Sequence, residues 1–171
     1  MRTILTAAML AAAFSSAAAA AELRLPAEGR GEVVVTATSL SRDAGGGVIA
    51  TGRSTVVHGD LSISCAGTIR IALSGDFFSA LEASGTVEAK AGNRALRAGR
   101  LDYESTRHLV TLRGNPEVVE NGTTYRAGER ILLYLETGVM RCEPKAMISV
   151  DRRFQKPAPP KPKRRRLFGL F

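Results

Sequence analysis

A glycine, a valine and a pair of apolar residues recur in this chain about every 30 residues. The distance from glycine to couplet is seventeen, sixteen and seventeen residues in the three occurrences. A single β-hairpin is marginally stable in water, so repeated short units of this kind must stack and share an apolar face. The three occurrences are Gly52–Val56–Ile69–Ile71, Gly85–Val87–Leu101–Tyr103 and Gly114–Val118–Ile131–Leu133.

The residues around each glycine alternate in the manner of a β-strand. In LEASGTVEA, residues 81–89, every second residue is apolar or glycine and the residues between them are polar. A period of two places one set on a buried face and the other in water. Residues 48–56 and 110–118 keep the same phase, and shorter apolar strands follow at 68–73, 100–103 and 130–135. We therefore predict an all-β domain in which each unit is two short strands joined by a glycine-containing turn, and a hairpin turn at Asn121-Gly122.

The first 21 residues predict a secretory signal peptide. One arginine precedes a long uncharged run, and small residues provide cleavage points after Ala20 or Ala21. The alternative is a membrane anchor, because the run approaches the roughly 20 residues that span a bilayer. Its Ala and Ser content favours cleavage and secretion. We expect residues 22–31 to form a short linker and residues 32–151 to form one domain.

The last twenty residues, 152–171, form a basic tail rich in proline. They contain eight of the 24 Lys and Arg residues and no acid, so the sixteen basic residues left elsewhere balance all sixteen acidic ones. The net charge of +8 therefore belongs to the tail, and nothing predicts a nucleic-acid partner. The tail is either a solubilising end or a contact with anionic lipid headgroups, made by Lys161, Lys163, Arg164, Arg165 and Arg166 beside the apolar LFGLF end.

The segment LRGNPEVVENGTTYRAGERILLYLETGVMRC, residues 112–142, resembles the repeat of the LptA/OstA family of periplasmic lipopolysaccharide transport proteins. Gly114-Asn115, residues 128–131 and residues 135–138 stand where that repeat has its Gly-Asn, its acid-Arg-Ile segment and its L-x-T-G. The resemblance extends over about residues 33–148. It implies a β-jellyroll folded over like a taco, open at both ends, whose inner face carries acyl chains.

By the phase of the strands, that inner face includes ten residues. The resemblance implies that these side chains contact lipid. The alternation alone would equally fit the ordinary core of a closed β-sandwich. The residues are Val56, Ile69, Ile71, Leu81, Val87, Leu101, Tyr103, Val118, Ile131 and Leu133.

The resemblance also implies partners. These are lipopolysaccharide or a similar acylated glycolipid, further copies of the chain, and LptC-like and LptD-like proteins, joined edge to edge near residues 33–35 and 139–142. Two other functions stay open: a structural β-repeat protein that assembles without lipid, and an LptC-like or LptD-N-terminal-like module of the same pathway. An LptC-like protein would keep an N-terminal anchor.

Catalysis is not predicted, and neither is a cofactor or a metal. His58 and His108 fall in turns or at strand ends with no ligand spacing around them, and we expect both to be solvated. No nucleophile elbow is present. Cys65 and Cys142 either form a disulfide in the oxidising periplasm or remain buried free thiols.

Overall fold

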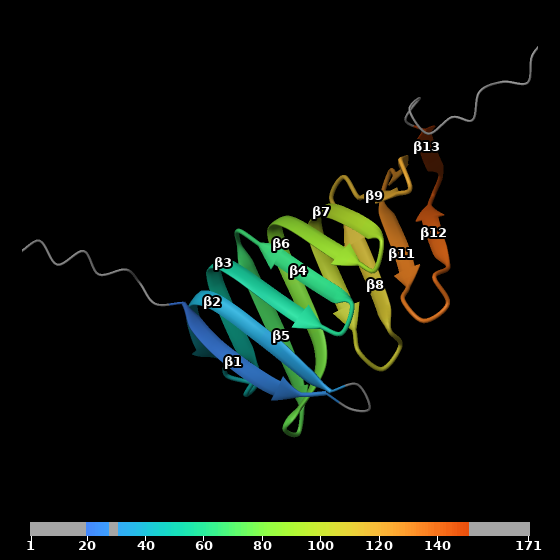
Figure 1. Ribbon diagram of the computed structural model, residues 1–171. Coiled ribbons are helices and arrows are strands. Elements are labelled where there is room, and N and C mark those ends of the chain that lie inside the picture. The colour runs from blue at the N-terminus through green and yellow to red at the C-terminus, as the bar shows by residue number, and fades with distance from the viewer. Residues whose placement is uncertain (1–19, 28–30, 151–171) are drawn as a thin grey trace, which may run out of the picture.

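The computed structural model describes residues 20–27 and 31–150, and these form thirteen strands and no helix. In Figure 1 the strands follow one another across the molecule, from β1 at one end to β12 and β13 at the other. The strands are β1 (Ala21–Pro26), β2 (Glu32–Arg42), β3 (Val48–His58), β4 (Leu61–Cys65), β5 (Thr68–Ser74), β6 (Phe77–Ala91), β7 (Arg94–Glu104), β8 (Leu109–Arg113), β9 (Glu117–Glu120), β10 (Thr123–Ala127), β11 (Arg130–Tyr134), β12 (Met140–Glu143) and β13 (Ala146–Val150).

The long strands each belong to two parts of one folded antiparallel sheet. Residues 54–58 of β3 pair with β4, whereas residues 48–51 of the same strand pair with β5. In β6, residues 87–91 pair with β4, and residues 77–84 pair with β5. The sheet is therefore bent in the middle of its long strands, and the expected all-β, folded-over architecture is confirmed.

The fold divides the sheet into two walls. Wall 1 contains β1, β4, β9, β10 and β13 together with residues 32–37, 54–58, 87–91 and 94–98 of the long strands. Wall 2 contains β5, β8, β11 and β12 together with residues 39–42, 48–51, 77–84 and 100–104. Apolar side chains from both walls form the core between them.

Glycines mark the line along which the sheet bends, which we call the crease. Gly52 and Gly85 lie inside β3 and β6 at this line and have φ of +83° and +120°, a conformation that favours glycine. At the crease, the N–H of Gly99 donates to the carbonyl of Gly114 at 2.8 Å. The alternation places Gly52 and Gly85 within strands, and there they permit the bend between the two walls, whereas the expected turns between strands contain other glycines such as Gly92 and Gly122.

The crease also explains the length of the repeat. From Gly114 the chain runs outward along wall 1 in β9, returns in β10 and crosses the crease at Gly128 before β11 begins on wall 2. Val118 is the buried residue of β9, and Ile131 is the first buried residue of β11 on wall 2. This excursion along wall 1, out in one strand and back in the next, therefore accounts for the sixteen or seventeen residues between the glycine and the apolar couplet. At the outer end of this excursion Asn121 and Gly122 form the expected two-residue hairpin, both with positive φ.

The N-terminal boundary differs from the expectation. Residues 22–31 were expected to be a linker, but they contain most of β1, which pairs with residues 32–37 of β2. The short alternation of Leu23 and Leu25 is enough to make a strand, because β2 offers it a ready hydrogen-bonding edge. Val33 and Val35 consequently lie between β1 and β3 rather than at an edge of the sheet.

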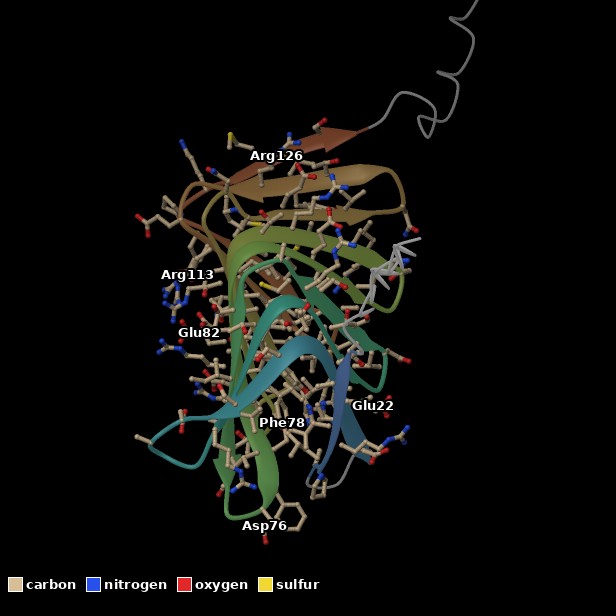
Figure 2. All side chains as sticks on the ribbon, turned by 90° about the vertical axis from the view of Figure 1, so that its left-hand side faces the viewer. Glu22, Asp76, Phe78, Glu82, Arg113 and Arg126 are labelled. Atoms are coloured by element: carbon tan, nitrogen blue, oxygen red, sulfur yellow. The ribbon has the colours of Figure 1, made fainter. Side chains whose placement is uncertain are left out.

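Charged residues cover the outer faces of both walls and pair across neighbouring strands. Arg97 lies 3.4 Å from Glu88 on wall 1, and Arg100 lies 3.1 Å from Glu82 on wall 2. Figure 2 shows Glu82 and Arg113 pointing away from the interior. Exposed pairs of this kind contribute little stability, about 0–1 kcal/mol each, but opposite charges on adjacent strands favour the observed register.

Candidate functional site

The ten residues predicted for the inner face all lie between the walls. Each is at most 3% exposed, and they belong to one continuous apolar cluster. The assignment of faces from the alternation is therefore confirmed by burial. In the structure these side chains pack against one another, and contact with lipid stays a prediction.

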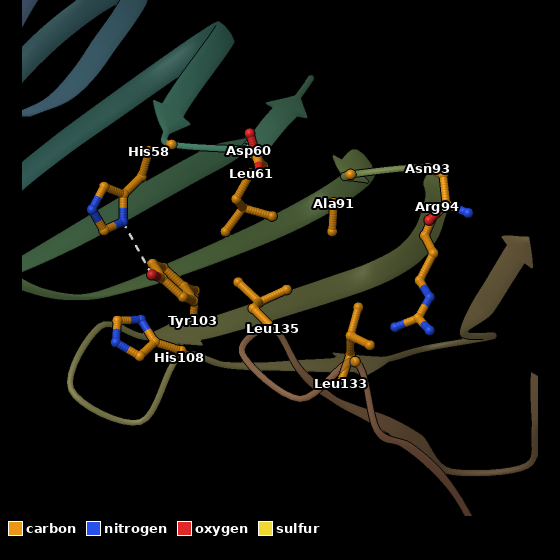
Figure 3. Close-up of a pocket in the computed structure, with 13 residues that line it drawn as sticks. His58, Asp60, Leu61, Ala91, Asn93, Arg94, Tyr103, His108, Leu133 and Leu135 are labelled. Carbon is orange, nitrogen blue, oxygen red and sulfur yellow. Dashed lines mark hydrogen bonds between the residues drawn. The ribbon is translucent and has the colours of Figure 1, made fainter. Parts of the chain in front are cut away.

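A cavity of about 310 Å³ lies where the two walls meet at the side opposite the crease, which we call the mouth. The turns of wall 1 contribute residues 58–61 and 91–94, and wall 2 contributes Tyr103, His108, Leu133, Leu135 and Gly138. Figure 3 shows the apolar side chains of Leu61, Leu133 and Leu135 at this cavity. The mouth thus combines an apolar floor with polar residues from the turns at its rim.

One hydrogen bond crosses the mouth from wall to wall. The hydroxyl of Tyr103 and Nδ1 of His58 are 3.0 Å apart, as drawn in Figure 3. The ring of Phe78 packs against both, with centroid distances of 5.7 Å to His58 and 5.9 Å to Tyr103. The prediction that His58 is solvated was wrong: its side chain follows Ser54 and Val56 on the inward phase of β3 and is only 6% exposed.

Side-chain contacts hold the turns at the rim. Nε of Arg94 lies 3.0 Å from a carboxylate oxygen of Glu120 on wall 1, and both side chains are largely buried. On wall 2, Nε2 of His108 lies 3.3 Å from a carboxylate oxygen of Glu136. Each pair joins two neighbouring turns of the same wall.

The C-terminal end of the sheet carries exposed apolar residues. In the part of the chain that is described, β12 pairs with β11 alone and β13 with β10 alone, so each has a free edge. Ile148 of β13 is opposite Tyr125 on the inward face and is 62% exposed. Val139, 48% exposed, stands just before β12. The predicted edge at residues 139–142 therefore coincides with β12.

The two cysteines are free thiols and do not form the disulfide considered from the sequence. Cys65 lies on β4 beside the crease, where its Sγ accepts a hydrogen bond from the N–H of Gly67 at 3.2 Å. Cys142 lies on β12, five strands away in the sheet order, which is roughly 24 Å at about 4.8 Å per strand. A disulfide requires Cα atoms within about 7 Å. Burial raises the pKa of the Cys142 thiol, which keeps it protonated at neutral pH.

Within residues 20–27 and 31–150, no group of three His, Cys, Asp or Glu side chains could hold a metal ion. The same residues contain no helix long and apolar enough to cross a membrane. Residues 1–19 of the expected signal peptide lie outside the described residues. So does the tail with Lys161, Lys163 and Arg164–Arg166.

Comparison with known proteins gives a likeness in structure. No protein-family model matches the chain, and no curated protein matches it in sequence. Among solved structures, the chain is similar to LptH of Pseudomonas aeruginosa, described as the LptA-homologous periplasmic component of the conserved lipopolysaccharide transport device. The TM-score is 0.60 at 16% sequence identity, over 70% of this chain and 94% of that one. At this identity the likeness establishes the LptA-like fold.

Proposed function

We propose that this protein is a periplasmic component of lipopolysaccharide transport that shields acyl chains between its two walls and passes the lipid toward the outer membrane. The observation that carries the proposal is an interior lined by apolar side chains, in a fold shared with a periplasmic transport component. Burial of each methylene group is worth about 0.8 kcal/mol, so a lipid with several chains gains from such an interior. The role assigned to the chain is binding and transfer, without catalysis.

The test is to purify the mature protein from a host that makes lipopolysaccharide and to identify the lipid that accompanies it. We expect an acylated glycolipid in the purified sample, and binding of added lipopolysaccharide by the delipidated protein. Absence of both would refute transport. A mature N-terminus at Ala21 or Glu22 would favour this role over that of an anchored LptC-like module.

A structural role without lipid is the second candidate, and one observation favours it. The inward residues are already packed between the walls, so the domain has a complete core before any lipid binds. The strand edges that are free at both ends of the described sheet would then serve assembly alone. An LptD-N-terminal-like module of the same pathway would use the same edges.

Self-association is expected to depend on the C-terminal end. We propose that β12 and β13 pair with the N-terminal edge of a second copy or of an LptC-like or LptD-like partner. Ile148→Lys places a charge on the exposed inward position of this end and should weaken self-association by about tenfold, since charged edges resist pairing. Sedimentation at increasing protein concentration measures this. Val57→Lys, an exposed position on β3 within the sheet, is the control and should associate like the wild type; equal association of all three proteins would contradict the proposal.

The tail is proposed to contact anionic headgroups. Each basic residue near a charged membrane contributes about 1 kcal/mol, and salt weakens the attraction. A protein truncated after Asp151 should lose most of its affinity for anionic liposomes at low salt while its thermal unfolding is unchanged. Liposome flotation with full-length and truncated protein measures this. If both float equally, the tail is a solvated end.

A further inference from the structure

The two walls are joined very differently on their two sides. Along the crease, β3, β6 and β7 continue covalently from one wall to the other. On the opposite side, among the described residues, backbone pairing between the walls is limited to an isolated bridge of Ala27 with Phe78 near the β1 end. Beyond that bridge, the contacts across the mouth are made by side chains.

Opening at the mouth would therefore preserve the strand ladders. A rotation of the walls about the glycine-lined crease leaves the hydrogen bonds within each wall in place. It must break the bond of His58 to Tyr103 and the contact of the His58 ring with Phe78, and it separates apolar side chains of the two walls. Separation of neighbouring strands at either end would instead remove several backbone hydrogen bonds at once.

We propose that His58 and Tyr103 form a catch across the mouth, and that the cavity beside them is a side entrance through which an acyl chain reaches the interior. This inference rests on the proposed lipid-binding function. The cavity fits an amphipathic lipid. Leu61, Leu133 and Leu135 would face the acyl chain, while Asp60 and Asn93 at the rim would lie beside the polar headgroup. When the catch opens, the floor of the cavity becomes continuous with the buried core.

The test of the catch is Tyr103→Phe, which removes one oxygen atom and retains the ring packed against Phe78. With fluorescent lipopolysaccharide as the probe, stopped-flow uptake should become about fivefold faster, the effect of losing one hydrogen bond that opening must otherwise break. The matched control is Tyr134→Phe on the outer face of wall 2, where the ring lies under Arg141. Its uptake rate should equal that of the wild type. Uptake that Tyr103→Phe leaves unchanged would overturn the catch.

The route of entry is tested separately by photocrosslinking. Benzoylphenylalanine in place of Asn93 at the rim should capture the lipid in the earliest time points, before the same group in place of Ser149 at the C-terminal end does so. Earliest capture at residue 149 would overturn the side entrance and leave lipid binding intact. A wild-type protein that takes up no lipopolysaccharide would instead overturn the proposed function together with this inference.

Discussion

Gly67→Ala is expected to destabilise the domain by about 3 kcal/mol, in the upper range for overpacking. A Cβ at this position would lie 2.1 Å from the carbonyl oxygen of Ser84 and 3.3 Å from Cα of Gly85. Both are backbone atoms of the neighbouring strand at the crease, so no side-chain rotation relieves the clash. Thermal unfolding by circular dichroism should show a decrease of more than about 10 °C.

Gly128→Ala is the matched control, because Gly128 occupies the crease between β10 and β11. There the nearest atom to an added Cβ is Cδ of Pro144 at 3.6 Å, an ordinary contact, and the backbone is not left-handed. Its stability should stay within about 0.5 kcal/mol of the wild type. A Gly67→Ala protein as stable as this control would contradict the close approach of strands at the crease.

Leu133→Glu and Ile71→Glu are expected to unfold the domain and so to abolish lipid binding. Both side chains are at most 1% exposed and belong to the apolar cluster, so a carboxylate at either position would have to be desolvated. The cost of about 5 kcal/mol or more matches the whole stability of a typical domain. Circular dichroism should show loss of the cooperative transition.

Loss of binding through unfolding does not test the lipid site, so a second position is needed. Leu135 lines the mouth but is only partly buried, and Leu135→Glu should fold while binding lipopolysaccharide at least tenfold more weakly. Thr86→Glu is exposed on the outside of the crease and should bind like the wild type. Equal affinity of these two folded variants would contradict lipid entry between the walls.

The strand pattern could be predicted well because it depends on neighbours in sequence. Leu81, Ala83, Val87 and Ala89 are buried as the alternation in residues 81–89 predicts, and the polar residues between them are less buried. The strand β1 was missed because two leucines in a six-residue strand give too weak a period. His58 was assigned to solvent because it stands next to a glycine in a segment that predicts a turn. Its position two residues after Val56 on the inward face of β3 would have indicated burial.

The sequence by itself determined the all-β class, the inward and outward faces and the spacing of the repeat, because side-chain alternation and glycine conformations are local properties of the chain. Only the tertiary structure decided that the glycines form a crease, that His58 meets Tyr103 across the mouth, and that Cys65 and Cys142 lie on distant strands. These facts depend on which strands become neighbours. The fold brings together residues that are distant in the sequence, such as His58 and Tyr103, which are 45 positions apart, and no local pattern encodes that choice.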